Sequence, residues 1–340
     1  MNVFKIHKII ILLVISISIY SCSVRKYIPE NEYLYRGATI NYVDTVNTKS
    51  YPEVKLEVEN VLYPEPNSKF LGMYPGLYFH YKAQREKPGF INKFLNKKIG
   101  EEPVYYSSVE LQETEELINN RLENSGFFYN TISSESVLDS ASKTGKAKYT
   151  VALKKPYTLE TFQLEEDSLS IADTLEIISK LKTALKESAI KKGMRFNLAA
   201  LKTERERLDT YLKQQGYYNF NGDFLIFEAD TNAYKDKRFD LYLRFKENVP
   251  KKSKVPYKVQ DVDIYPNESI VTQNKFKDTV TLDSLDFIES GLFFKPKRLS
   301  PYVLLKPGQR YNPILSKYTS RRLSSIGTYK FLNGRHEDRY

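Results

Sequence analysis

The segment YLKQQGYYNF, residues 211–220, joins the end of an amphipathic helix to the beginning of an aromatic-led strand. Its apolar stripe stops at Gly216, and glycine closes helices well because it enters the left-handed conformation without a Cβ clash. The chain repeats this pattern as RLENSGFFYN at 121–130 and, more loosely, as LSSIGTYKFL at 323–332. The three glycines are therefore interpreted as structural caps: Gly126, Gly216 and Gly327.

The clearest copy of the pattern lies in a unit that spans residues 157–250. Apolar residues at helical spacing predict two amphipathic helices in it, and residues 239–245 alternate strictly between apolar and polar, as a half-buried strand does. The unit therefore reads β-α-α-β-β. The expected elements, in order, are a strand at 157–164, helices over 171–185 and 201–212, a strand at 224–227, a polar loop at 230–237 and a strand at 239–245.

Two further units flank this one. The first, residues 32–156, has the same ending, and its segment 64–102 is rich in Pro, Gly and aromatics, which indicates a helix or loop insertion. The third, residues 257–340, reaches a strand at 329–332 but lacks the closing hairpin strand, so it is expected to be incomplete. The other elements expected in the first unit are a strand at 34–43, a helix that stops at Gly126, a strand at 132–138, a loop at 139–148 and an alternating strand from Tyr149.

The first 21 residues are typical of a signal peptide. Lys5 and Lys8 precede an apolar run at 9–20 that is too short to span a bilayer. The only cysteine, Cys22, follows at once, and Ile19-Tyr20-Ser21-Cys22 resembles the lipobox of bacterial lipoproteins. Cys22 is therefore the predicted lipidation site, followed by a linker at 22–31; an incidental cysteine or an uncleaved anchor is the alternative. The residues after it, Ser23-Val24-Arg25-Lys26, are basic, whereas surface-exported lipoproteins of the bacteria that this lipobox resembles tend to carry an acidic stretch here, so the resemblance favours the periplasmic side.

Composition excludes several classes of function. The chain has 340 residues, a net charge of +10 and 41% hydrophobic residues, enough to build real cores. Its basic residues are scattered, which is not typical of nucleic-acid binding. A lone cysteine excludes a disulfide framework, and no HExxH, P-loop or nucleophile-elbow motif is present. Glu115–Glu116 and Glu204–Glu206 are interpreted as surface charges, although an acid/base pair from distant segments stays open.

Tandem β-α-α-β-β units behind an export signal resemble the polypeptide-transport-associated (POTRA) domain. More closely, the chain resembles the periplasmic region of Bacteroidetes lipoprotein-type BamA/TamA-like outer-membrane assembly proteins. The residues that carry this are 66–72 with Pro75 and Tyr81, and LKPGQRYN (305–312) with RRLSSIGTYKF (321–331). The resemblance spans roughly residues 22–333. Such proteins continue into a membrane β-barrel, and nothing after Leu332 has its alternating pattern, so we expect a chain that lacks the barrel.

The resemblance implies an α+β fold of tandem POTRA-like domains, each a small mixed sheet covered by two helices. It implies a non-catalytic module of outer-membrane protein assembly that binds polypeptides by β-augmentation at exposed sheet edges. The expected partners are the outer membrane, through the N-terminal lipid, and unfolded outer-membrane proteins or an assembly partner; no cofactor, metal, nucleic acid or small-molecule substrate is expected. The candidate edge residues are Ile132, Ser134, Ser136, Phe224, Leu225, Ile226 and Phe227.

Two alternatives stay open at this point. The predicted edge strands can be covered by neighbouring units, or they can be exposed and bind nothing, because the sequence does not show what lies beside a strand. The chain can also be a lipid-anchored periplasmic scaffold or adhesin that binds no client strand. Under either alternative, the expected location of the chain is the periplasmic side of the outer membrane.

Overall fold

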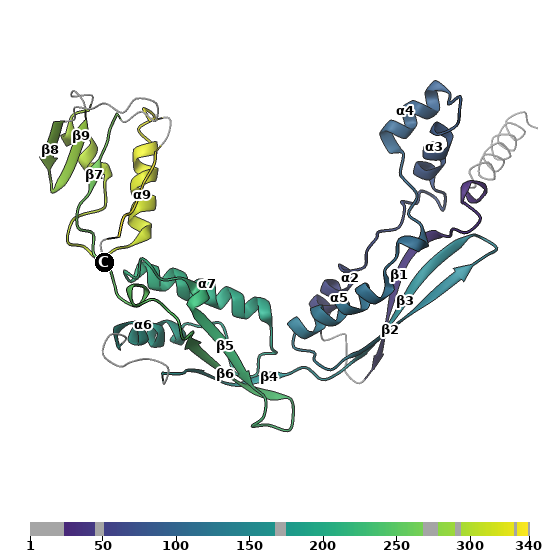
Figure 1. Cartoon of the computed structure of the whole chain (residues 1–340), viewed down its shortest axis with the longest axis horizontal. Helices are drawn as coiled ribbons and strands as arrows, with labels where there is room; N and C mark the ends of the chain where they lie inside the picture. The colour runs from purple at the N-terminus through teal and green to yellow at the C-terminus, as the bar shows by residue number, and fades with distance from the viewer. Residues whose placement is uncertain are drawn as a thin grey trace, which may run out of the picture. The chain divides into compact units, whose positions relative to one another are not determined.

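A computed structural model describes residues 24–44, 51–166, 175–267, 278–289, 294–329 and 332–338 (Figure 1). The expected signal segment and Cys22 lie outside the described residues. The chain divides into two compact units, Met1–Tyr157 and Thr158–Tyr340. The described strands form three three-stranded sheets, each with one parallel and one antiparallel pairing. The α+β class with small mixed sheets is therefore confirmed.

The sheet of the first unit has the strand order β1-β3-β2, with β1 parallel and β2 antiparallel to the central β3. The expected β-α-α-β-β order is present, and α3 and α4 fill the predicted insertion. The bounds are β1 (Leu34–Asp44), α2 (Pro52–Glu59), α3 (Pro75–Ala83), α4 (Phe90–Ile99), α5 (Leu111–Asn124), β2 (Thr131–Asp139) and β3 (Thr144–Leu153), with short 3-10 helices at Arg25–Tyr27 and Tyr106–Ser108.

Two hydrophobic clusters hold this unit together. In the larger cluster, alternate residues of β3 meet one face of α5 and of α2, as the period of two in a strand and of 3.6 in a helix require. In the smaller cluster, Val24 and Ile28 pack against Tyr74 and Leu77 at the start of α3. Two neighbouring residues of β1 belong to different clusters: Leu34 lies in the smaller cluster and Tyr35 in the larger one.

The base of the insertion is fixed by one buried asparagine. Asn67 donates from Nδ2 to the carbonyl oxygen of Glu102 at 2.7 Å, and its Oδ1 accepts from the backbone N–H of Val104 at 2.9 Å. The Glu101 carboxylate accepts from the N–H of Ser68 at 2.8 Å and from Nδ2 of Asn67 at 3.3 Å; burial opposes ionisation, but the hydrogen bonds from Ser68 and Asn67 lower the pKa of Glu101. The two ends of the insertion are thereby held side by side.

The predicted loop at 139–148 is wrong in its second half. Strand β3 begins at Thr144, because Lys143 adopts a positive φ of 51° and the chain turns back at once. The Asp139 carboxylate supports this turn by accepting from the backbone N–H groups of Ala141 and Ser142 at 2.9 and 3.2 Å. The Ser/Lys/Gly composition of this segment predicted a long loop, but the segment is a tight turn flanked by paired strand residues.

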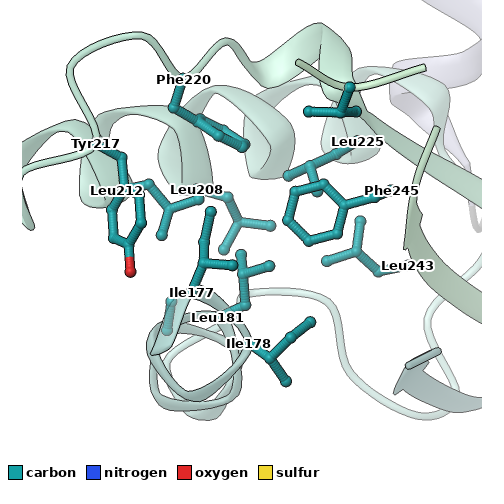
Figure 2. Packing of buried hydrophobic residues seen from close by; sticks show 12 residues of the cluster. Ile177, Ile178, Leu181, Leu208, Leu212, Tyr217, Phe220, Leu225, Leu243 and Phe245 are labelled. Carbon is teal, nitrogen blue, oxygen red and sulfur yellow. The ribbon is translucent and has the colours of Figure 1, made fainter. Parts of the chain in front are cut away.

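The second sheet has the order β4-β6-β5, the same topology as the first. Figure 2 shows its core, in which Leu181 of α6 and Leu208 and Leu212 of α7 belong to one cluster with Leu243 and Phe245 of the sheet. The bounds are β4 (Thr158–Leu164), α6 (Leu175–Lys186), α7 (Leu198–Gln214), the 3-10 helix Gly222–Phe224, β5 (Leu225–Asp230) and β6 (Arg238–Phe245).

The third sheet differs from the expected order. Its strands run β7-β9-β8 and all three precede the helices, so the expected sequence of elements is wrong here. Asp283 and Ser284 both have positive φ, 53° and 62°, which builds a two-residue hairpin between β8 and β9. Asp-Ser is a weak hairpin signal, so this turn was not predicted from the sequence. The bounds are β7 (Asp263–Ile264), β8 (Asp278–Leu282), β9 (Leu285–Glu289), α8 (Pro296–Leu299) and α9 (Pro313–Ser324).

The strand expected at 329–332 is also not found where the structure describes this segment. Tyr329 and Leu332 lie outside every described strand, and Tyr329 instead packs against the cluster around Leu285 and Phe287. The antiparallel position beside β9 is filled by β8. The hairpin of β8 and β9, which follows β7 in the chain, thus takes the place in the sheet where a later strand was expected.

The three glycines named as caps all have positive φ: 86° at Gly126, 99° at Gly216 and 74° at Gly327. At the end of α7, the N–H of Gly216 donates to the carbonyl of Lys213 and the N–H of Tyr217 to that of Leu212, both at 3.1 Å. The left-handed residue thus turns the chain so that Tyr217 enters the core.

Gly216→Ala is expected to destabilise the second unit by about 2 kcal/mol, of which about 1 kcal/mol is the cost of left-handed backbone. The remainder comes from crowding, since a Cβ at Gly216 would lie 2.6 Å from Cγ of Arg310. Gly193→Ala is the matched control, because Gly193 has φ 83° with nothing within 4 Å of its added Cβ. Urea unfolding measures both. Arg310→Ala should recover part of the Gly216→Ala loss; equal losses at both glycines would contradict the crowding.

Candidate functional site

The edge strand β2 carries Ile132, Ser134 and Ser136, and the structure engages the side chains of all three internally. Ile132 packs against the core, Ser134 donates to the Glu115 carboxylate at 2.5 Å, and the Tyr106 hydroxyl donates to Ser136 at 2.7 Å. These side chains lie toward α5 and the neighbouring 3-10 helix. What β2 offers outward is therefore its backbone, along a strand of nine residues.

The edge strand β5 holds three of the four residues named for the second unit. Leu225 is fully buried, and Phe227 packs against the core beside Phe162, with ring centroids 6.0 Å apart. Ile226 points to the opposite face of the sheet. Phe224 ends a 3-10 helix instead of starting the strand, and its ring meets Phe220 edge-on at 5.9 Å.

The register of β5 shows which of its backbone groups are free to bind. The N–H of Lys246 donates to the carbonyl of Phe224 at 2.9 Å, on the same register that pairs Ile226 with Arg244. Hydrogen-bonded residues alternate along an antiparallel strand, so Ile226 and Glu228 bond to β6. The N–H and C=O groups of Leu225, Phe227 and Ala229 therefore point away from β6, and no described strand pairs with them.

An open groove of about 450 Å³ adjoins this edge. Its lining includes Phe224, Ile226 and Glu228 from the β5 side and Arg244 from β6, so it combines apolar surface with an ion pair between Arg244 and Glu228. Glu228 and Arg244 were not predicted from the sequence. The sequence did contain a signal for both residues. Arg244 occupies a polar, solvent-facing position of the alternating strand, and Glu228 lies two residues beyond Ile226.

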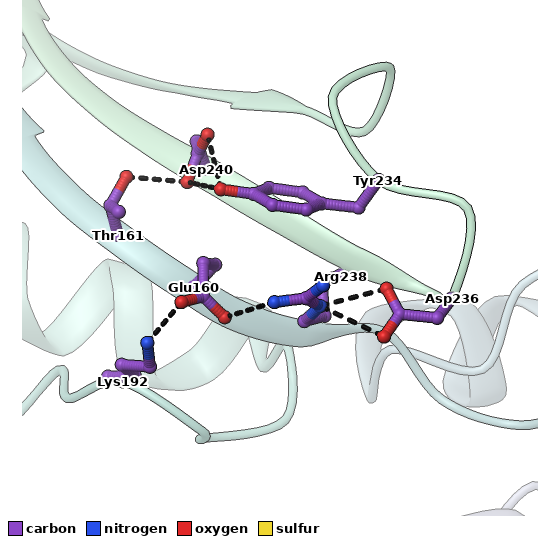
Figure 3. A network of polar contacts seen from close by, with 7 residues as sticks. All are labelled: Glu160, Thr161, Lys192, Tyr234, Asp236, Arg238 and Asp240. Atoms are coloured by element: carbon purple, nitrogen blue, oxygen red, sulfur yellow. Dashed lines mark hydrogen bonds and ion pairs between the residues drawn. The ribbon is translucent and has the colours of Figure 1, made fainter.

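Figure 3 shows a polar network at the β4 side of the same sheet. Glu160 of β4 forms ion pairs with Lys192 and with Arg238 of β6, whose Nη1 lies 2.9 Å from Glu160 Oε2. Arg238 Nε also donates to Asp236 at 2.8 Å. Because each of these groups has an opposite charge as its partner, the network is built to fasten β4 and the β5–β6 loop to β6.

The pKa values in this network follow the same partners. Hydrogen bonds from Lys192 and Arg238 hold the pKa of the Glu160 carboxyl below its usual range. Desolvation and then the hydrogen bond to Asp240 raise the pKa of the Tyr234 hydroxyl, which donates to both oxygens of Asp240 at 3.2 Å. Glu160 thus stays ionised and Tyr234 protonated near neutral pH, which suits fixed contacts and not proton transfer.

The interpretation of Glu204 as a surface charge is wrong. Its side chain is only 3% exposed, and both of its oxygens accept from Arg207, at 2.7 and 2.8 Å. Arg207 also donates to the carbonyl of Ala184, the last core residue of α6. The pair therefore joins α7 to the end of α6. Residues three apart on a helix can form such an ion pair, but the sequence alone does not show which face of α7 is buried.

The described residues contain no group of three or more His, Cys, Asp or Glu side chains placed to hold a metal ion. None of their helices has the length and apolar character needed to cross a membrane.

Comparisons with known proteins identify no family. No protein-family model matches the chain, and no curated protein matches it. Among solved structures, the chain is similar to POTRA domains 3–5 of BamA from Haemophilus influenzae, at 11% identity and a TM-score of 0.36, covering 91% of this chain and 92% of that one.

Two cyanobacterial structures are similar to a comparable extent. POTRA domains 1–3 of Omp85 from Anabaena match at 15% identity and a TM-score of 0.28, over 90% of this chain and 89% of that one. The N-terminal domain of Omp85 from Thermosynechococcus elongatus matches at 13% identity and a TM-score of 0.27, over 90% of each chain. At these scores the fold rests on the chain's own strand order, described above.

Proposed function

We propose that this chain is a non-catalytic, tandem POTRA-type module of outer-membrane protein assembly that binds extended polypeptide segments by strand addition. The observation that carries the proposal is the outward backbone of β5, where Leu225, Phe227 and Ala229 direct hydrogen-bonding groups away from the sheet. An added strand satisfies such groups with main-chain bonds that are largely indifferent to sequence. The groove beside Ile226 would receive an apolar side chain of the guest.

The first unit supports the same function through β2. It is the outer strand of a sheet with identical topology, and the side chains of Ser134 and Ser136 are tied down by Glu115 and Tyr106. A rigid edge loses little conformational entropy when a guest strand pairs with it. Two such edges on one chain would raise the effective affinity for a long guest, since each edge alone binds weakly.

The proposal includes the location. Cys22 carries the lipid that anchors the chain at the periplasmic side of the outer membrane, and the guests are unfolded outer-membrane proteins or a partner of the assembly machinery. The supporting observations are the basic and apolar leader and the lipobox-like residues Ile19-Tyr20-Ser21-Cys22 of the sequence. Metabolic labelling with a radioactive fatty acid should mark the wild-type chain and not Cys22→Ser.

Ala229→Pro is expected to weaken the binding of an extended peptide about 5- to 10-fold, because it removes one outward N–H and places a ring where the guest backbone would pair. The probe is a fluorescent peptide copied from one strand of an outer-membrane barrel, measured by anisotropy with the full chain. The fold should survive, since proline is tolerated on an edge strand when its N–H faces outward.

Ala229→Val is the matched control, because it keeps the N–H and favours strand conformation. It should bind the peptide as the wild type does. Equal affinity of the proline and valine variants would contradict strand addition at β5, and a wild type with no affinity for any barrel-derived peptide would favour the alternative of a scaffold or adhesin.

A further inference from the structure

Helix α4 exposes an unusual amount of apolar side chain. Phe90 is 82% exposed, Ile91 69%, Phe94 52% and Ile99 47%, although the helix has only ten residues. The rings of Phe90 and Phe94 stack on each other with centroids 6.4 Å apart, so they form one continuous patch. Single exposed hydrophobic residues are ordinary in soluble proteins, but a contiguous apolar patch usually marks a surface that binds something.

The patch lies on the side of α4 that faces away from its neighbour. Figure 1 shows α3 and α4 as a helical hairpin beyond the end of the first sheet. Leu95 and Asn96 are half-buried, so their side of α4 is the one that packs. Phe90 and Phe94 are four residues apart and lie together on the other side, and Ile91, 69% exposed, borders them. In the part of the first unit that the structure describes, nothing covers them.

The surroundings of the patch are strongly basic. Lys93, Lys97 and Lys98 are exposed on the same helix. Among residues 82–98 there are six basic side chains and one acidic one, Glu86. None of the three lysines forms an ion pair within the described part of the chain, so all three are available to an anionic surface.

We propose that α4 is an interfacial helix that lies on an anionic lipid bilayer, with its phenylalanines at the level of the headgroups. Phe on one side of a short helix and lysines around it are the composition of helices that lie in the plane of a membrane surface. Each lysine near an anionic surface contributes about 1 kcal/mol. Neither a second copy of this basic helix nor a basic partner would complement that charge.

The position of the hairpin in the chain supports this occupant. Val24 packs against Tyr74 and Leu77 at the start of α3, and Val24 lies two residues after Cys22. Two extended residues span about 7 Å, so a lipid on Cys22 would hold the α3–α4 hairpin close to the bilayer. This step rests on the proposed lipidation, whereas the patch and its charge do not. A ten-residue helix binds weakly alone, and such tethering raises its effective concentration.

The chain contains no tryptophan, which permits a local test with the full protein. Phe94→Trp places the chain's only tryptophan in the patch, and Tyr318→Trp, at an exposed position of α9, is the control. Each variant is mixed with phosphatidylethanolamine vesicles that contain about one quarter phosphatidylglycerol. We expect the emission of Phe94→Trp to move to shorter wavelength and to be quenched by brominated acyl chains, and that of Tyr318→Trp to do neither.

Charge reversal tests the electrostatic part. In the Phe94→Trp background, Lys93→Glu with Lys97→Glu and Lys98→Glu should abolish the shift on anionic vesicles, and neutral phosphatidylcholine vesicles should give little shift with either protein. An unchanged emission on anionic vesicles would overturn the proposal. So would a shift that grows with protein concentration without vesicles, because a second copy would then cover the patch. No residue of β2 or β5 is altered, so the outcome is independent of strand addition.

Discussion

Leu212→Ala is expected to lower the free energy of unfolding of the second unit by about 3 kcal/mol. Leu212 of α7 is fully buried beside Leu208 and Tyr217, in the same cluster as the sheet residue Leu243 (Figure 2). Truncation removes three carbon atoms from the core and leaves a cavity that the surrounding rigid elements fill only in part. Denaturant unfolding followed by circular dichroism measures the loss, and hydrogen exchange of the β6 amides locates it.

The control for this prediction is Leu175→Ala. Leu175 begins α6, the helix that covers the same core, but its side chain is 63% exposed. Its truncation should change the free energy of unfolding by no more than about 0.5 kcal/mol, as is usual for surface positions. A similar loss from both leucines would mean that burial in this core does not determine the stability of the unit.

Arg207→Ala is expected to cost about 2 to 3 kcal/mol, because it leaves the Glu204 carboxylate buried without its partner. Breaking a buried ion pair at one end is more damaging than replacing both ends, and this figure is reduced because the Arg207 side chain is about one third exposed. The carbonyl of Ala184 also loses a donor. Urea unfolding at pH 7 is the measurement.

The double replacement Glu204→Leu with Arg207→Leu separates charge from packing. It removes both charges and keeps apolar volume between α6 and α7, so it should recover most of the loss of Arg207→Ala. Glu204→Leu alone should also be milder than Arg207→Ala, since Arg207 can still reach solvent. If the double variant is as unstable as Arg207→Ala, the buried charge is not the cause.

Much of the fold could be predicted from the sequence where one period dominated. Alternation in residues 239–245 identified a half-buried strand, and glycine after an apolar stripe located the ends of α5 and α7. These signals are local, because burial of one face imposes the period directly on neighbouring residues. The order of the first two units followed from them.

The remainder depends on contacts between distant residues. Nothing in the sequence pairs β7 with β9 across the intervening residues, and the Asp283-Ser284 turn uses left-handed residues that are not glycine or asparagine. The burial of Glu204 depends on which way α7 faces. In the candidate site, the resemblance placed the edge strands, but their outward groups could not be predicted, because a shift of one residue exchanges bonded and free amides.

In each of the first two sheets, the strand that begins the module and the strand that ends it are adjacent and parallel. A force applied between the two ends of such a module acts at opposite ends of that strand pair, so it slides β1 along β3, or β4 along β6, in shear. The ladder of interstrand bonds then has to yield almost together and not one by one, as it would if the strands were peeled apart. If the chain is anchored at Cys22 and holds a guest polypeptide, as proposed above, tension between the two would load each of these two modules in this shear direction.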